Sequence, residues 1–285
     1  MAGLKIIECP RDAMQGIKEY IPVETKVAYI SKLLEVGFDT IDIGSFVSPK
    51  AIPQMRDTAE VLQALDFSKT KSKLLTIVAN ARGAKAAMEF DEIDYLGYPF
   101  SISETFQMRN TNATIEESMD RVADIQSQTI KNNKKLVIYI SMGFGNPYGD
   151  PWNVEIVERY VTQLYSMGIK IFSLSDTIGV SNPDSIAYLF SQLIPAFSDV
   201  EFGAHLHTTP DKWEEKVHTA YANGCRRFDG AIKGYGGCPM AKDDLTGNMP
   251  TEQMLHYFDE NKIETGLNMD AFGQSIKASE AVFLH

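Results

Sequence analysis

The chain has 285 residues and a formal net charge of −11; 44% of its residues are hydrophobic and 23% are charged. This composition is typical of a globular protein with enough length to bury a core. The acidic balance argues against general binding to nucleic acid or to anionic membranes. Three cysteines, Cys9, Cys225 and Cys238, are too few for a disulfide framework, so we expect a cytoplasmic location. We expect no targeting segment or membrane helix, because no apolar run approaches ~20 residues.

Short apolar runs alternate with amphipathic stretches along the whole chain. Eight runs rich in Ile, Val and Phe predict strands at Leu4–Cys9, Thr40–Gly44, Lys73–Val78, Glu92–Gly97, Leu136–Met142, Ile169–Leu174, Val200–His207 and Arg226–Ala231. Most of the stretches between them predict helices. Val23–Glu35 leads to Gly37, a plausible helix stop, and Asn182 followed by Pro183 is typical of a helix start.

Eight such units predict a parallel sheet with helical crossovers, which can close into a (β/α)₈ TIM barrel. A doubly wound open sheet has the same periodicity and is the alternative, although no G-x-G-x-x-G pattern follows the first strand. No linker divides the chain. We therefore expect a single TIM-barrel catalytic domain over residues 1–285, with a C-terminal helical extension from about residue 268.

In a barrel of this kind, reactive residues lie at the carboxyl ends of the strands. Arg11 and Asp12 follow the first strand, as either a surface ion pair or a cationic donor beside a metal ligand. Asp42 ends the second strand, either on the surface or in the barrel mouth, where Arg11 or a metal could compensate its charge. Asp176 ends the sixth strand; if no site is assumed, capping of the following turn is the favoured interpretation.

The last third of the chain holds the most informative patterns. His205 and His207 are two residues apart on a strand, so they face the same side and could share a metal. Cys238 follows the glycine-rich residues 234–237, as either an incidental thiol or a reactive one on a loop. Asn248 offers an amide oxygen, as either a metal ligand or a turn residue.

A set of motifs extends over almost the whole length. They are PRDAMQ (10–15), IDIGSFVSPKAIPQM (41–55), SISETFQMRNTNATIEES (101–118), LSDTIGV (174–180), HLH (205–207), GGCP (236–239) and TGN (246–248). Each is weak to moderate alone. Together they resemble the 3-hydroxy-3-methylglutaryl-CoA lyase family of the DRE-TIM metallolyases.

The resemblance implies a divalent-metal-dependent lyase that cleaves 3-hydroxy-3-methylglutaryl-CoA to acetyl-CoA and acetoacetate, as in leucine degradation and ketone-body formation. It implies Mg²⁺ or Mn²⁺ held by Asp12, His205, His207 and Asn248. The implied catalytic residues are Arg11, for the enolate, Cys238, for proton transfer, Asp42 and Asp176. The implied contacts of the acyl-CoA substrate are Gln15, Ser45 and Lys50. The resemblance also implies a homodimer.

The chain departs from the family pattern at a few places. The family usually has Glu where Asp42 stands, and Asp where Thr208 follows the second histidine, which removes a possible hydrogen-bond acceptor. The loop from Cys238 to Asn248 is one residue longer than usual, and the segment before Arg11 one shorter. Two alternatives stay open: a related aldolase, lyase or synthase acting on another 3-hydroxyacyl-CoA or 2-oxoacid, and a non-catalytic barrel that binds an acyl-CoA.

Overall fold

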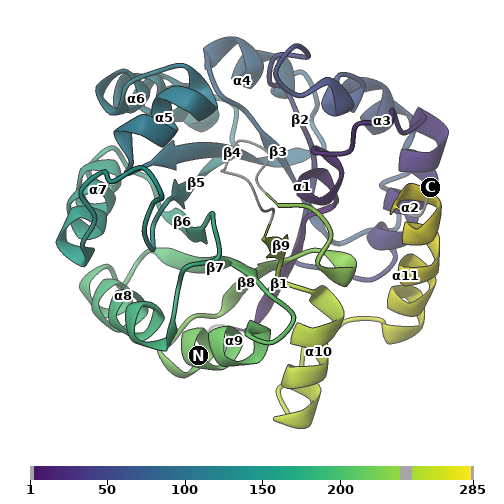
Figure 1. The fold of residues 1–285 in the computed structure, drawn as a ribbon. Helices are drawn as coiled ribbons and strands as arrows, with labels where there is room; N and C mark the ends of the chain where they lie inside the picture. The colour runs from purple at the N-terminus through teal and green to yellow at the C-terminus, as the bar shows by residue number, and fades with distance from the viewer. Residues whose placement is uncertain (1–2, 238–245, 284–285) are drawn as a thin grey trace.

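Eight parallel strands form a closed ring in the computed structural model, which describes residues 3–237 and 246–283 (Figure 1). The strands are β1 Lys5–Glu8, β2 Thr40–Ser45, β3 Lys73–Ile77, β4 Ile93–Ser101, β5 Lys135–Ser141, β6 Ile171–Asp176, β7 Glu201–Thr208 and β8 Arg227–Gly230. Their hydrogen-bonded order is β6-β5-β4-β3-β2-β1-β8-β7, and β6 also pairs with β7. The ring confirms the predicted TIM barrel and excludes the open doubly wound sheet.

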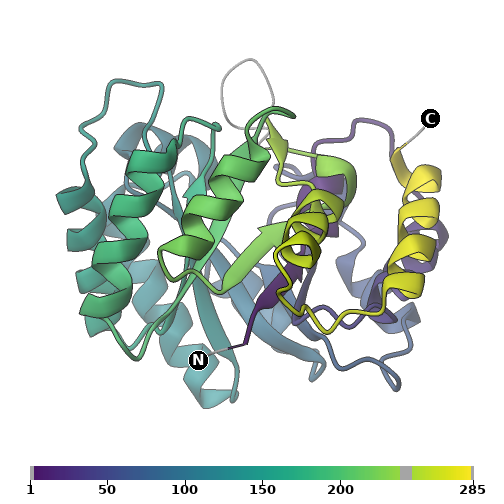
Figure 2. The same cartoon turned by 90° about the horizontal axis from the view of Figure 1, so that it is seen from below.

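The helices surround the ring and cover its outer face, except the short first helix, which lies inside the circle that the others form (Figures 1 and 2). They are α1 Pro10–Met14, α2 Val23–Leu34, α3 Thr58–Ala64, α4 Ala81–Ala87, α5 Glu104–Thr111, α6 Ile115–Lys131, α7 Val154–Ser166, α8 Pro183–Ala196, α9 Trp213–Ala222, α10 Thr251–Glu260 and α11 Met269–Phe283, with 3₁₀ turns η1 Pro53–Met55 and η2 Ile232–Gly234. The C-terminal helix α11 packs its Phe283 edge-on against Tyr29 of α2, with ring centroids 6.0 Å apart. This packing confirms the predicted helical extension. Within the described residues, every helix is too short or too polar to cross a membrane.

Local sequence explains where individual elements begin and end. Asn182 accepts a hydrogen bond from the backbone N–H of Ser185 and caps α8, with Pro183 in the first turn as predicted. Strand β4 runs to Ser101, four residues beyond the predicted end at Gly97. Pro99 is a typical strand breaker. Here β4 continues through it because its pairing with β5 extends to Ser101, and the next residue, Phe100, is fully buried in the core.

A buried carboxyl group joins the first strand to the last part of the chain. Glu8 is inaccessible to solvent and accepts hydrogen bonds from the Ile232 backbone N–H (2.9 Å) and the Thr251 hydroxyl (2.6 Å). Burial raises the pKa of Glu8 from 4.5 to about 8, although both hydrogen bonds act to lower it. The folded protein therefore keeps a proton between these pH values that the unfolded chain loses.

The free energy of unfolding should consequently fall as pH rises from about 5 to about 8. Replacing Glu8 with Gln removes this titration, so the variant should be more stable than the wild type above pH 8, by on the order of 2 kcal/mol. Urea unfolding across this pH range measures the difference, with Glu89→Gln on the exposed surface as the control. Parallel pH profiles for wild type and Glu8→Gln would contradict the prediction.

Candidate active site

A cavity of about 350 Å³ opens at the carboxyl ends of the barrel strands. Seven of the eight strands, or the segments that follow them, contribute to its wall. Six of the site residues predicted from the sequence line this cavity: Arg11, Asp12, Gln15, Ser45, His205 and His207. The cavity thus lies where a TIM barrel normally carries its catalytic residues.

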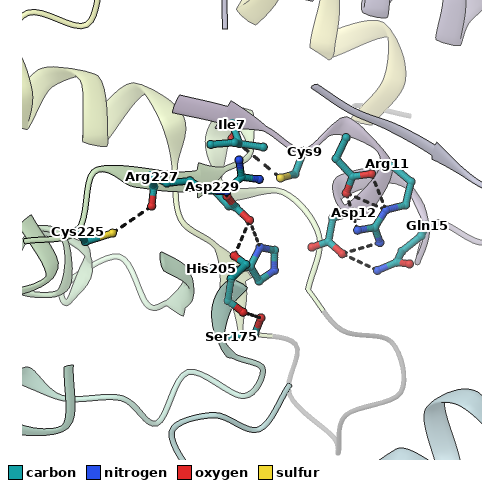
Figure 3. Close-up of polar contacts among 12 residues, drawn as sticks. Ile7, Cys9, Arg11, Asp12, Gln15, Ser175, His205, Cys225, Arg227 and Asp229 are labelled. Carbon is teal, nitrogen blue, oxygen red and sulfur yellow. Dashed lines mark hydrogen bonds and ion pairs between the residues drawn. The ribbon is translucent and has the colours of Figure 1, made fainter. Parts of the chain in front are cut away.

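Asp12, His205 and His207 converge on one side of this cavity. Each offers one ligand atom, and all three atoms lie within 4.8 Å of one another. The two histidines come from one strand, β7, whose alternation turns both rings the same way. Asp12 arrives from α1, which begins at Pro10 directly after β1 (Figure 3). The structure therefore brings together three of the four predicted metal ligands as a cluster.

The fourth predicted ligand, Asn248, lies beside this cluster. It belongs to the two-residue strand β9 (Gly247–Asn248), which pairs antiparallel with β7 and places Asn248 opposite His207. The amide nitrogen of Asn248 donates to the Tyr235 carbonyl at 2.8 Å, so its amide oxygen is available for a cation. Gly236 allows this close packing: its φ is +93°, and a Cβ there would lie 2.7 Å from the Asp12 carbonyl oxygen.

The protonation states of Asp12 and His207 suit a divalent cation. Burial would raise the pKa of Asp12, but the charges of Arg11, His205 and His207 outweigh it and lower the pKa to about 2. Burial, together with the neighbouring His205, lowers the pKa of His207 to about 4. At neutral pH the two groups are a carboxylate and a neutral imidazole, which are the forms that bind metals.

The hydrogen bonding leads to the same conclusion. Asp12 uses one oxygen, Oδ1, to accept from Arg11 (2.9 Å) and Gln15 (2.7 Å). Its other oxygen, Oδ2, and Nδ1 of His207 are buried and have no hydrogen-bond partner within the described residues. Unsatisfied buried polar atoms are rare in proteins. Two of them in one cluster, on residue types that bind metals, fit a divalent cation.

Arg11 lies between two carboxylates. Its Nε and Nη2 donate to Asp42, at 3.0 and 2.5 Å from Oδ2, and its Nη1 donates to Asp12. Asp42 has no exposed surface, and burial raises its pKa to about 6 in spite of the opposing effect of Arg11. Of the two interpretations of Asp42, the structure supports the barrel-mouth one, and the compensating charge comes from Arg11.

Asp176 lies behind the cavity wall. Its carboxylate accepts from the backbone N–H groups of Val180 and Ser181, from the Ser181 hydroxyl and from the buried ammonium of Lys216. Lys216 also donates to the His207 carbonyl at 2.8 Å. Asp176 thus holds the turn after β6, as the capping interpretation expects. Through Lys216 it also supports the backbone of His207.

The remaining predicted residues differ in their placement. Gln15 contacts Asp12, and the Ser45 hydroxyl lies in the wall with no hydrogen-bond partner in the described part of the chain. Lys50 is exposed and does not belong to the wall. Cys238 lies outside the described residues, and its role stays a prediction.

The family model named HMGL-like matches residues 4–278. The chain belongs to the HMGL-like family. Among its relatives, a hydroxymethylglutaryl-CoA lyase of Bacillus subtilis is 32% identical over 261 residues, covering 92% of this chain and 86% of that protein. A hydroxymethylglutaryl-CoA lyase of Pseudomonas mevalonii is 31% identical over 275 residues, covering 96% and 90%. These findings confirm the resemblance stated from the motifs and show that the chain is an enzyme.

Solved structures of HMGL-like enzymes have the same fold. An HMG-CoA lyase from Acinetobacter baumannii, solved with coenzyme A and 3-methylmalate, superimposes with a TM-score of 0.92 at 31% identity, covering 99% of this chain and 92% of that one. An HMG-CoA lyase from Brucella melitensis gives a TM-score of 0.92 at 29% identity, with full coverage of both chains.

Sequence reasoning missed Asp229, which supports the HMGL-like site from β8. Its Oδ2 lies 3.2 Å from Nδ1 of His205 and accepts from the Ser173 hydroxyl at 3.0 Å. Because the carboxylate of Asp229 pairs with Nδ1, the other ring nitrogen of His205, Nε2, is free to bind a metal in the Asp12 cluster. A signal was present in the sequence: Arg227 and Asp229 are two apart on a predicted strand, so both charges face the same side of it.

Thr208 follows the second histidine, at the position where the resemblance to the family implied an Asp, so no carboxylate is present there. Its hydroxyl donates to the Thr209 carbonyl at 3.0 Å. This is the departure expected from the sequence.

Proposed function

We propose that this chain is a divalent-metal-dependent lyase that cleaves 3-hydroxy-3-methylglutaryl-CoA into acetyl-CoA and acetoacetate. The observation that carries the proposal is the Asp12–His205–His207 cluster with Arg11 beside it in one cavity. This arrangement combines a site for a hard cation with a fixed positive charge next to it. Carbon–carbon cleavage beside a thioester needs both, since a hydroxyl must lose its proton and an enolate must be stabilised.

The cavity suits the acyl part of such a substrate. One wall carries the cluster and Arg11, whereas another is apolar and includes Ile77, Pro99 and Phe106. A polar wall that binds the carboxylate and hydroxyl groups, facing an apolar wall that contacts the methyl group, would fix the orientation of the substrate. Gln15 and Ser45 are the proposed polar contacts, and Lys50 a contact of coenzyme A at the exposed rim.

In the proposed reaction, Asp12, His205, His207 and Asn248 hold Mg²⁺ or Mn²⁺. When bound, this cation supplies Lewis acidity that lowers the pKa of the tertiary hydroxyl of the substrate. The hydroxyl gives its proton to the Cys238 thiolate, which we assign as the base. As the C2–C3 bond breaks, the C3 oxygen becomes the ketone of acetoacetate, and the electron pair of the broken bond moves onto the thioester as an enolate.

Arg11 stabilises the enolate through its guanidinium, which Asp42 holds in place. We assign proton transfer to Cys238, so that protonation of the enolate carbon gives acetyl-CoA while acetoacetate leaves.

Release of acetoacetate tests the proposal directly. Purified protein should produce acetoacetate from 3-hydroxy-3-methylglutaryl-CoA with added Mn²⁺ or Mg²⁺, lose this activity in chelator and regain it when metal is restored. Glutaryl-CoA, which lacks the tertiary hydroxyl, is the control and should give no product. Absence of acetoacetate from metal-loaded protein would reject this substrate in favour of another 3-hydroxyacyl-CoA or a 2-oxoacid.

We further infer a single catalytic domain, a homodimer and a cytoplasmic enzyme of leucine degradation or ketone-body formation. The similarity to relatives named as cytoplasmic 3-hydroxy-3-methylglutaryl-CoA lyases of rat and human supports this location. Light scattering of the purified chain tests the dimer, because a monomer mass would contradict it.

A further inference from the structure

A second group of side chains that could bind a metal shares His205 with the first. Its other two members, Cys9 and Asp229, do not line the cavity, so we call it the deeper group. Cys9, His205 and Asp229 each offer one ligand atom, and the three atoms lie within 4.8 Å of one another. In Figure 3, Cys9 and Asp229 lie above the His205 ring, whereas Asp12 lies to its right. His205 therefore belongs to two clusters.

Two atoms of this deeper group, on Asp229 and Cys9, lack a strong hydrogen-bond partner among the described residues. Asp229 is only 2% exposed, and its Oδ1 accepts no hydrogen bond from the described residues. The nearest cationic atom, Nε of Arg227, stays 3.9 Å away. The thiol of Cys9 is 1% exposed, and its Sγ lies 4.0 Å from the Ile7 carbonyl, too far for a strong hydrogen bond. A cation between these atoms would satisfy both.

The ligand types determine which cation this would be. The upper cluster, formed by Asp12, His205 and His207 with Asn248 beside them, offers a carboxylate, two imidazoles and an amide, which suit Mg²⁺ or Mn²⁺. The deeper group exchanges the amide and one imidazole for a thiol, and sulfur selects softer ions such as Zn²⁺ and Cd²⁺. Nδ1 of His205 already faces Asp229, so this nitrogen can bind a cation in the deeper group without a flip of the ring.

We propose that Cys9, His205 and Asp229 form a second metal site that takes a thiophilic divalent cation and competes with the Asp12 cluster for His205. On binding, the thiol gives its proton to solvent, and the sulfur–metal bond forms in its place. A neutral imidazole has one lone pair and cannot bind an ion on each nitrogen. Occupation of the deeper site therefore withdraws His205 from the upper cluster and inhibits the enzyme.

Cadmium binding by a single-thiol protein tests the site without any use of catalysis. The sequence has three cysteines, so the double variant Cys225→Ala, Cys238→Ser leaves Cys9 alone. Addition of Cd²⁺ to the chelator-treated variant should produce the ultraviolet thiolate-to-cadmium absorption band, saturating at a single ion per chain. Asp229→Asn in the same background should weaken the binding by about 10-fold or more.

A folded single-thiol variant, verified by circular dichroism, that shows no band would overturn the site. If the double variant does not fold, the difference in band intensity between wild type and Cys9→Ala provides the same test. Equal intensities would refute the proposal.

Competition is measured by electron paramagnetic resonance of Mn²⁺. Cd²⁺ should release bound Mn²⁺ from the wild type at a concentration about 10-fold or more below that needed for Cys9→Ala. Release at equal concentrations would show that Cys9 takes no part. Because both readouts follow metal binding alone, they remain valid if the protein proves inactive on 3-hydroxy-3-methylglutaryl-CoA.

Discussion

Alanine in place of His207 should lower Mn²⁺ affinity by about 100-fold or more and reduce turnover in proportion at limiting metal. His207 is 2% exposed, and its Nδ1 is unpaired within the described structure. Burial with the neighbouring His205 keeps its pKa near 4, so the wild-type ring is a neutral ligand at any pH at which the enzyme would be assayed. Its removal leaves too few donors to replace the water molecules around the cation.

Titration of Mn²⁺ followed by electron paramagnetic resonance measures the affinity. His218→Ala is the matched control, because His218 lies on α9 and contacts the Tyr257 hydroxyl at 2.9 Å, away from the cavity wall. It should bind Mn²⁺ as the wild type does. An unchanged affinity in His207→Ala would remove this residue from the proposed ligands.

The barrel could be predicted because most of its strands are short runs rich in Ile, Val, Leu and Phe that alternate with amphipathic stretches. In a TIM barrel one face of each strand packs on helices and the other fills the interior, so the strands read as short continuous apolar runs. The C-terminal limit of β4 could not be predicted in the same way. Pro99 is a strand breaker by type, but β4 stays paired with β5 as far as Ser101, and Phe100 packs in the core.

The residues of the site show the same difference between what the local sequence indicates and what depends on packing partners. Arg11, Asp12 and the two histidines could be placed at strand ends from chain position, and the resemblance to the family supplied their roles. Asp229 and Lys216 could not, because their roles depend on which strand or helix lies beside β7. Asp176 falls on both sides of this distinction: its role in the turn after β6 was the favoured interpretation from the sequence, whereas its contact with Lys216 becomes visible only when α9 is placed beside it.

Replacing Arg11 with Lys should lower kcat for 3-hydroxy-3-methylglutaryl-CoA by about 10²–10³ while Mn²⁺ affinity changes only a few-fold. Lysine keeps the charge but has a single nitrogen, so it cannot bridge Asp42 and Asp12 as the guanidinium does. A displaced ammonium still attracts the enolate, but from the wrong position. Acetoacetate release at saturating metal and substrate measures the effect.

The conservative exchange Arg226→Lys provides the control. Arg226 donates to the carbonyl groups of Tyr221 and Cys225 and does not line the cavity, so its replacement should leave kcat unchanged. A loss in Arg11→Lys that is confined to KM would mean that Arg11 binds the substrate equally in the ground state and the transition state. A loss confined to kcat would place its contribution on the enolate, because charge develops there only as the carbon–carbon bond breaks.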